Sequence, residues 1–174
     1  MIRFDCEACV IRPWRDSDRA SLLRFANNRK IWRNLRDRFP HPYTEADADA
    51  WFAHCRESPE QAGWAIEVEN QAAGGISLRP GQDVYAKTGE IGYWLGEPWW
   101  GRGIMTRAVR VVSDHGVNRL GLERIEAPVF EWNPASMRVL EKCGYQREST
   151  RRRSIFKDGQ LIDCVLYVRL AGSV

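Results

Sequence analysis

The sequence predicts a single domain of the α/β (α+β) class, and three observations lead to this prediction. The length of 174 residues suits one domain with a core of its own. Segments with β-type alternation are interleaved with segments of helical periodicity, and no repeat or composition shift marks a linker. The sequence shows no signal peptide and no run of about eighteen apolar residues, so we expect a cytoplasmic protein that does not enter a membrane.

Charge and cysteine content argue against several other classes. The 26 basic and 23 acidic residues leave a net charge of +3, which is too balanced to predict nucleic acid as a partner. Five cysteines without an export signal favour reduced thiols over a disulfide framework. Cys6 and Cys9 form a C-x-x-C pattern, but a structural zinc site needs a second ligand pair, and only His54 with Cys55 offers one. We therefore expect two thiols at the first strand or its turn, and no metal site.

The N-terminal part of the chain predicts one strand end and two helices. Val10–Arg12 ends a first strand, and an acidic turn then gives N-cap chemistry for a helix around Leu22. A second helix is expected over 45–56, with Thr44 as its cap and apolar residues at helical spacing. Between the helices, residues 30–43 form an irregular stretch that is rich in aromatic residues and proline.

The middle of the chain predicts a hairpin and a central strand. Residues 64–68 alternate between apolar and smaller or charged side chains, and a turn over 69–73 leads into a strand over 75–78. Residues 90–95 predict a further, central strand.

The C-terminal half predicts two more helices and three more strands. A helix begins at Ile104 and ends by Gly121, and Arg124–Phe130 predicts a strand. A short helix over 136–143 is closed by a glycine. The last two strands cover 145–156 and 161–170 and form a hairpin, because an Asp-Gly pair lies between them.

A glycine-rich loop joins the central strand to the long helix. Three glycines and a proline break the pattern over 96–103, and Ile104 opens the helix. Gly101 and Gly103 lack a Cβ, so the backbone can adopt left-handed angles and bring its amides close to a ligand. Because helix-start amides lack intrahelical partners and the macrodipole favours negative charge, this junction predicts a phosphate-binding loop.

The same loop resembles the acyl-CoA loop of the GNAT superfamily of N-acetyltransferases. The general pattern is Gln or Arg, two residues, Gly, one residue, then Gly or Ala, and these positions are Trp100, Gly103 and Met105 here. Two of the three depart from that pattern, but Trp-Gly-x-Gly-Ile-Met-Thr is similar to the RimJ/RimL-like branch, which acetylates the N termini of ribosomal proteins. Downstream, Asn133 to Ser136 and the following helix ending in Gly144-Tyr145 are similar to the family's Asn-x-x-Ser helix. A weaker similarity, Ile11-Arg12-Pro13-Trp14, lies near the N terminus.

The resemblance implies a fold and a cofactor. The implied fold is one GNAT domain over 1–174, with a mixed, mostly antiparallel sheet of six to seven strands, split between its central strands and flanked by about four helices. The strand 90–95 would splay from its neighbour and pair through its main chain with the pantetheine arm of acetyl-CoA, and the loop amides would hold the pyrophosphate. The expected cofactor residues are Tyr93, Trp94, Leu95, Gly101, Arg102, Gly103, Ile104, Met105, Thr106, Asn133 and Lys142. For Arg102 and Lys142, solvated surface charge is an equal alternative, and Asn133 would bond either the pantetheine or the adjacent chain.

The resemblance also implies direct attack of an amine on the thioester in a ternary complex. An α-amino group with a pKa of about 8 is far more often neutral at pH 7 than a lysine side chain at about 10.4, so a protein or peptide N terminus is the easier acceptor. Glu90 is the candidate base, with an edge charge as its alternative. Ser136 is the candidate donor to the leaving thiolate, since Leu140 stands where many relatives have tyrosine, and helix capping is the alternative role of Ser136. The expected acceptor wall contains Trp32, Phe39 and Tyr43.

Other interpretations of the sequence remain open to different degrees. A dinucleotide enzyme would need a third glycine where Thr106 stands, and a doubly wound sheet that the hairpins at both ends deny. A non-enzymatic acyl-CoA-binding module, or an acetyltransferase for a polyamine, aminoglycoside or amino acid, is compatible with the same motifs. Cys143 has no nearby histidine to activate it and is expected to be a buried small residue. The residues Arg151, Arg152 and Arg153 suggest a solvated strand, because alternate residues of a strand face opposite sides. Dimerisation is compatible with the fold, but no residue demands it.

Overall fold

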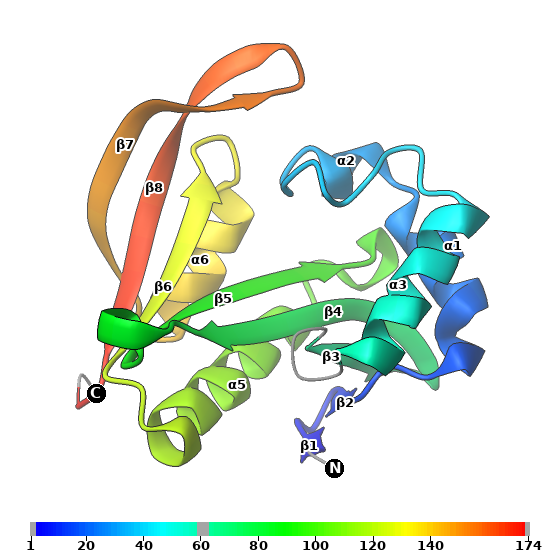
Figure 1. Ribbon diagram of the computed structural model, residues 1–174, viewed down its shortest axis with the longest axis horizontal. Helices are drawn as coiled ribbons and strands as arrows, with labels where there is room; N and C mark the ends of the chain where they lie inside the picture. The colour runs from blue at the N-terminus through cyan, green and yellow to red at the C-terminus, as the bar shows by residue number, and fades with distance from the viewer. Residues whose placement is uncertain (1–2, 59–62, 173–174) are drawn as a thin grey trace. The chain divides into compact units, whose positions relative to one another are not determined.

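A computed structural model describes residues 3–58 and 63–172 of the chain (Figure 1). The described residues contain eight strands and five α-helices, so the counts of six to seven strands and four helices were slightly low. The strands follow the order β1-β2-β3-β4-β5-β6-β8-β7, with β5 and β6 parallel and the other registered neighbours antiparallel. The predicted class, with a mixed and mostly antiparallel sheet, is confirmed. None of the helices in this described part combines the length and hydropathy that a membrane span requires.

The chain divides into two compact units. The first unit comprises residues 1–77 and 93–108, and the second unit comprises residues 78–92 and 109–174. The elements β4 (Gln71–Pro80), β5 (Thr88–Leu95) and α5 (Ile104–Leu120) each contribute residues to both units.

The strands of the first unit pair in antiparallel fashion. The strand β1 (Phe4–Asp5) pairs with β2 (Val10–Arg12), β2 pairs with β3 (Trp64–Val68), and β3 pairs with β4. The turn between β3 and β4 is shorter than the predicted 69–73, because β4 already begins at Gln71. Its two residues, Glu69 and Asn70, have φ angles of 51° and 60°, which allow a two-residue connection between twisted strands.

The helices of the first unit are α1 (Arg19–Ala26), α2 (Arg29–Trp32) and α3 (Glu45–Glu57). Thr44 caps α3 as predicted, because its side chain accepts a hydrogen bond from Asp47 N while the Asp47 carboxylate accepts one from Thr44 N. The stretch 30–43 is less irregular than expected, since the Asn28 side chain caps α2 through Lys30 N. α1 and α3 lie side by side (Figure 1). Their contact is part of a core made of Leu22, Ala26, Tyr43, Ala48 and Phe52.

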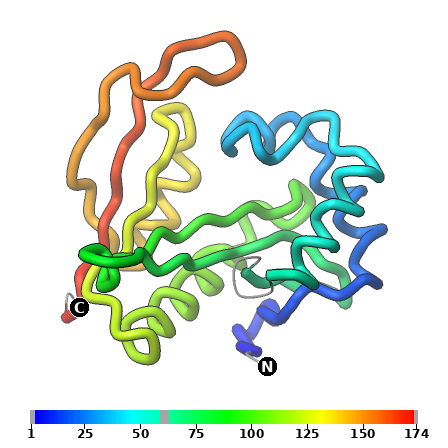
Figure 2. The backbone as a smooth tube through the Cα atoms, viewed as in Figure 1, coloured from blue at the N-terminus to red at the C-terminus, as the bar shows by residue number. Residues whose placement is uncertain are grey.

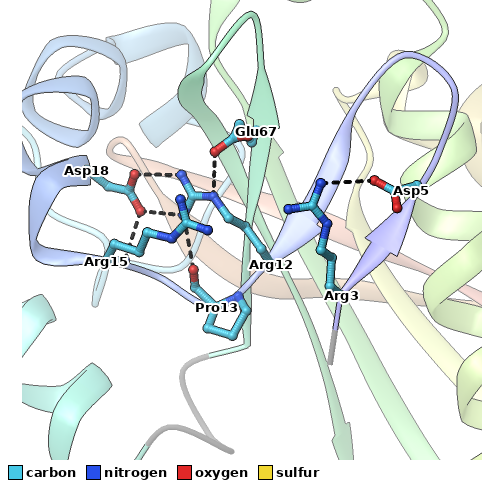
Figure 3. Close-up of polar contacts among 7 residues, drawn as sticks. All are labelled: Arg3, Asp5, Arg12, Pro13, Arg15, Asp18 and Glu67. Carbon is cyan, nitrogen blue, oxygen red and sulfur yellow. Dashed lines mark hydrogen bonds and ion pairs between the residues drawn. The ribbon is translucent and has the colours of Figure 1, made fainter. Parts of the chain in front are cut away.

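A buried ionic network joins β2, β3 and the turn before α1 (Figure 3). The Arg12 guanidinium donates to both carboxylate oxygens of Asp18, at 2.7 and 2.8 Å, and to Glu67 Oε2 at 2.5 Å. The hydrogen bond to Asp18 is the main reason that the pKa of Arg12 is raised. Asp18 also accepts a hydrogen bond from Arg15 N. One carboxylate therefore neutralises Arg12 and also stabilises the turn that contains Arg15.

The strands of the second unit surround β6 (Arg124–Phe130), whose bounds match the prediction. β5 pairs with β6 in parallel over Thr88–Glu90, and β6 pairs along its whole length with β8 (Gln160–Leu170). β8 also pairs with β7 (Gln146–Lys157), and the predicted Asp-Gly turn closes this long hairpin (Figure 2). The helix α6 (Pro134–Lys142) packs against β6.

The hairpin of β7 and β8 is irregular where the sequence contains three consecutive arginines. Arg151 pairs with Cys164 and Ile155 pairs with Ile162, so Arg152, Arg153 and Ser154 stand opposite Asp163 alone. Arg153 has a φ angle of 49°, in the left-handed region. The three arginines are all exposed within β7, so the expected solvated strand is confirmed, and a β-bulge interrupts the regular alternation at this place.

Candidate functional site

The glycine loop of the first unit lies between a 3-10 turn (Glu97–Trp99) and α5. Gly101 and Gly103 have φ angles of 76° and 74°, which side chains rarely tolerate. A Cβ at Gly101 would meet no atom within 4 Å, so the backbone is open at this point. Arg107 N donates to Gly103 O at 3.2 Å, and the amides of Ile104 and Met105 lie before it in the first turn of α5. The loop therefore presents main-chain amides at a helix start.

Tryptophans anchor this loop to the rest of the first unit. The Trp100 indole donates to Leu95 O at 2.7 Å, and Gly96 N donates to Ala73 O at the same distance. The buried Trp99 packs edge-on against Phe25, with 4.4 Å between ring centroids. The Leu95 carbonyl at the end of β5 is thus already used to hold Trp100.

Two arginines bring positive charge to the loop. Arg102 is exposed and forms an ion pair with Glu69 at 2.7 Å, so it is not an isolated cation. A Cβ at Gly103 would lie 2.9 Å from Arg107 Nη1, which places that guanidinium directly beside the loop. Arg107 also contacts Glu7 at 3.4 Å. The sequence reasoning missed Arg107, although its position four residues after Gly103 puts it on the same side of the helix.

The three aromatic residues of the predicted acceptor wall differ in their surroundings. Tyr43 is buried in the core of the first unit, and burial raises its pKa. Phe39 is half-buried and lies between Tyr43 and Trp94, with ring-centroid distances of 5.2 and 5.5 Å. Trp32 packs against His41 at 5.7 Å. The buried Tyr43 therefore packs behind Phe39. Phe39 in turn contacts Trp94, which was predicted to bind the cofactor.

Glu90 lies in the second unit, on β5. It is half-buried and stands opposite Glu126 in the parallel register of β5 and β6. Glu126 itself accepts a hydrogen bond from Arg124 at 2.7 Å. A carboxylate on a strand, partly shielded from water and beside a neutralised neighbour, is a suitable proton acceptor.

The start of α6 holds two further predicted residues. Asn133 is the N-cap of this helix, because its side chain accepts a hydrogen bond from Ser136 N at 3.2 Å. Asn133 thus bonds the adjacent chain, which was one of its two expected partners. Ser136 occupies the first turn and is half-buried, and the cap is Asn133 rather than Ser136. Lys142, in the last turn, is exposed, and its carbonyl accepts from Arg110.

The five cysteines are free thiols, and all but Cys55 are buried. Cys143 is buried, and burial raises the pKa of its thiol, so it is a poor nucleophile, as the sequence suggested. Cys6 and Cys9 lie in the turn between β1 and β2, where Cys6 N donates to Cys9 O. Over 3–58 and 63–172, no cluster of three or more metal-ligating side chains occurs.

Within the first unit, the structure brings together the glycine loop, the end of β5 and the aromatic residues. In the second unit it places Glu90 on β5, and Asn133, Ser136 and Lys142 on α6 or at its cap. Residues 9–146, which include all of these loop and helix positions, match the family described as the acetyltransferase (GNAT) domain. The chain belongs to the GNAT acetyltransferase family.

Curated relatives of this GNAT chain carry acetyltransferase names. Bacillus subtilis YjcK, described as a probable N-acetyltransferase, is 47% identical over 73 residues, which cover 42% of this chain and 40% of that protein. The ribosomal-protein-serine acetyltransferase of Escherichia coli K12 is 32% identical over 87 residues, or 50% of this chain and 49% of that protein. The chain spans only 40% to 44% of the length of the first curated relatives that it matches.

A solved structure supports the same GNAT assignment. RimJ of Mycobacterium smegmatis, in complex with CoA-disulfide, has a TM-score of 0.81 at 25% identity, over 94% of this chain and 82% of that chain. The predicted resemblance to the RimJ/RimL-like branch is confirmed, as is the GNAT fold. Acetyl-CoA is the acetyl donor of GNAT acetyltransferases.

The glycine loop of this GNAT chain fits the diphosphate of coenzyme A. Gly101 and Gly103 are both left-handed and Gly101 leaves open space, the amides of Ile104 and Met105 lie in the first turn of α5, and the Arg107 guanidinium stands beside Gly103. Main-chain amides, a helix N-terminus and an arginine are the groups with which proteins bind phosphate.

Proposed function

We propose that this protein is a single-domain N-acetyltransferase that transfers the acetyl group of acetyl-CoA to a primary amine, and that the amine is a protein or peptide N terminus. The open, left-handed glycine loop at the start of α5 carries this proposal, because it lies in the segment that matches the GNAT family. The name of the relative that acts on a ribosomal-protein serine supports the choice of acceptor.

In the proposed site, main-chain groups hold the donor. The amides from Gly101 to Thr106 bind the pyrophosphate, and Arg107 supplies positive charge beside Gly103. Arg102 and Lys142 are exposed and add charge at longer range. Tyr93 and Trp94 offer main-chain contacts to the pantetheine arm, together with the N–H of Leu95. Bound acetyl-CoA supplies an acetyl group activated as a thioester.

Side chains of the second unit move the protons. The Glu90 carboxylate accepts the proton of the attacking amine, directly or through a water molecule. The Ser136 hydroxyl donates a hydrogen bond to the departing sulfur, and Asn133 holds the helix start that positions Ser136. An N–H on the strand end at 93–95 donates to the acetyl oxygen, a contact typically worth about 3 kcal/mol of barrier.

Aromatic residues form the acceptor wall of the proposed site. Trp32 and Phe39 are half-buried and offer ring surface, while the buried Tyr43 fixes Phe39. An α-amine with a pKa of about 8 leaves a useful neutral fraction at pH 7, so a half-buried carboxylate is a sufficient base.

The donor site is tested by Gly103→Ala, with Gly121→Ala as a matched control. Both glycines have positive φ angles, 74° and 64°, but Gly121 follows α5 at its other end. The strained Cβ costs about 1–2 kcal/mol at each position, and it enters the loop only at Gly103. We expect calorimetry to show acetyl-CoA affinity reduced about 10-fold or more in Gly103→Ala, and unchanged in Gly121→Ala. Equal affinity in both variants would contradict the proposed loop.

The chemical roles are tested by Glu90→Gln and Ser136→Ala with peptides and small amines as acceptors. We expect kcat to fall by about 10²-fold or more for Glu90→Gln, with acetyl-CoA affinity retained. Wild-type protein that binds acetyl-CoA but acetylates no peptide, polyamine, aminoglycoside or amino acid would instead establish a binding module. Turnover with small amines alone would replace the proposed acceptor.

A further inference from the structure

Three consecutive arginines lie on a bulge of β7 in the second unit. Arg151, Arg152 and Arg153 are all exposed, and the register shift leaves Arg152, Arg153 and Ser154 opposite Asp163 alone. We call residues 151–154 the arginine bulge. β-Bulges re-aim side chains that a regular strand would direct to alternate faces.

Hydrogen bonds from another strand and a turn fix the shape of the arginine bulge. Arg153 N donates to Asp163 Oδ1 at 2.7 Å, which holds the left-handed residue in place. Asp163 N donates to Glu131 Oε1 at 2.9 Å, and Glu131 N donates to Asp163 O at 3.1 Å. The bulge is thereby tied to the turn between β6 and α6.

That turn leads into the start of α6, which carries Ser136, one of the two residues that we propose for the reaction. Asn133 N donates to Phe130 O, and the Asn133 side chain caps α6 at Ser136. Phe130 pairs with Cys164 on β8, and Cys164 pairs with Arg151 on β7. Two strand spacings separate the Cα atoms of Phe130 and Arg151, or about 10 Å.

The three guanidinium groups have no carboxylate partner among residues 3–58 and 63–172. The nearby carboxylates of Asp163 and Glu131 accept hydrogen bonds from main-chain amides, and the carboxylate of Glu148 forms an ion pair with Arg124. Uncompensated arginines at a fixed place favour an anionic ligand, since the guanidinium fork binds carboxylates in pairs of hydrogen bonds.

Apolar side chains follow the arginine bulge on the same hairpin. Phe156 and Leu161 stand opposite each other in the register and are 69% and 52% exposed. A small anion would use only the charges, whereas a peptide would also cover these side chains. The surface thus suits a peptide that carries acidic and apolar residues.

We propose that the arginine bulge binds acidic side chains of the acceptor peptide, which makes N termini followed by acidic residues the substrate class. This inference rests on the proposed function, which places the reacting amine near Ser136. An extended peptide spans about 3.3 Å per residue, so the separation of about 10 Å between the Cα atoms of Phe130, at the end of β6, and Arg151 corresponds to about three residues. The acidic side chains are expected around the third and fourth positions of the acceptor.

The test compares two peptides with the same first two residues, one with Asp or Glu at positions three and four and one with Gln there. Wild-type enzyme, Arg151→Gln/Arg152→Gln and the control Arg119→Gln are assayed on both. Arg119 is an exposed arginine near the end of α5 in the same unit. Arg153 is left intact because its backbone shapes the bulge.

We expect wild-type kcat/KM to be about 10-fold higher for the acidic peptide, since exposed ion pairs contribute a few-fold each. The double variant should lose this preference and keep its rate on the Gln peptide, and added salt should weaken the preference only in proteins with the arginines. The control should behave as wild type. No preference in the wild type, or an equal loss on both peptides, would overturn the inference while leaving the acetyltransferase proposal intact.

A different partner would also be recognised. If single-stranded RNA binds the wild type but not the double variant in a filter assay, and peptide preference is the same in both, the arginine bulge is an RNA site and the inference fails. If no peptide is acetylated at all, the proposed function fails first, which the acetyl-CoA and small-amine assays reveal.

Discussion

In the first unit a buried ion pair joins Arg12 and Asp18, whereas in the second unit two neutral hydroxyls share a buried hydrogen bond. Arg12 and Asp18 have side chains only 3% and 6% exposed. In the second unit, Ser113 Oγ and Tyr145 OH lie 2.7 Å apart in the core, and Arg124 pairs with Glu148 near the surface. The Arg12–Asp18 contact therefore depends on charge balance in the interior, whereas the Ser113–Tyr145 contact does not.

The two units also differ in the groups that we propose for binding and reaction. The first unit presents main-chain amides in the glycine loop, whose shape follows from two glycines. The second unit presents side chains, Glu90 and Ser136, whose positions depend on strand pairing and on the Asn133 cap. A site made of main-chain amides can keep its shape when surface side chains are substituted. A site made of side chains also depends on the strands and helices that orient them.

The largest effect on stability is expected from Arg12→Met, because it leaves the buried Asp18 without its counterion. Removing one partner of a buried pair typically costs about 3–5 kcal/mol of unfolding free energy. Urea denaturation measures this loss. The matched control is Arg56→Met in the same unit, since Arg56 and Asp16 form an exposed pair with 62% and 77% exposure, and we expect a loss below about 1 kcal/mol. Equal losses in the two variants would show that burial does not distinguish these pairs.

A smaller effect is expected from Tyr145→Phe in the second unit, because it leaves the Ser113 hydroxyl buried without this partner. An unsatisfied buried hydroxyl costs about 1–3 kcal/mol. Burial raises the pKa of Tyr145, so the hydroxyl stays protonated and the loss should be independent of pH between 6 and 9. Ser113→Ala should lower the free energy of unfolding less in the Tyr145→Phe background than in the wild type. A double-mutant cycle measures this difference. Strict additivity would show that the two hydroxyls do not stabilise each other.

The smallest effect concerns an exposed carboxylate. Hydrogen bonds from Lys30 and then Asn28 hold the pKa of Glu97 below its ordinary value. A lowered folded-state pKa gives stability above the unfolded-state pKa and loses it as pH falls through the folded-state value, so this contribution disappears in acid. In Lys30→Met, NMR titration should show the pKa of Glu97 rising toward its ordinary value.

Glu148 provides the internal control for that titration. Arg124 in the second unit holds the pKa of Glu148 low, and Lys30 is not among its causes. Its pKa should be the same in wild type and Lys30→Met. An unchanged pKa of Glu97 in the variant would mean that Lys30 does not stabilise its charge.

Much of the fold could be predicted because its signals are local. Thr44 caps α3 through a residue three positions away, and the Asp-Gly pair closes the last hairpin through its own backbone angles. The glycine loop was also predicted, since two residues determine its left-handed path. The short helix α2 was missed, because its single turn is held by one capping asparagine rather than by a periodic pattern.

The acceptor wall and the charges of the site were only partly predictable. Aromatic residues in an irregular stretch give no sign of their burial, so Tyr43 was expected in the wall although it lies in the core. Arg107 was missed because its place beside Gly103 depends on the path of the loop before the helix.

The sequence by itself determined the order of the elements, the caps and turns, and the glycine loop, because each depends on residues a few positions apart. Only the tertiary structure decided which charges are buried and where strands shift register. Arg12 finds Glu67 across 55 positions, and the arginine bulge is held by Asp163 and Glu131 from a different strand and a turn. Such contacts form when segments that are distant in the sequence pack together. A pattern of neighbouring residues therefore cannot predict them.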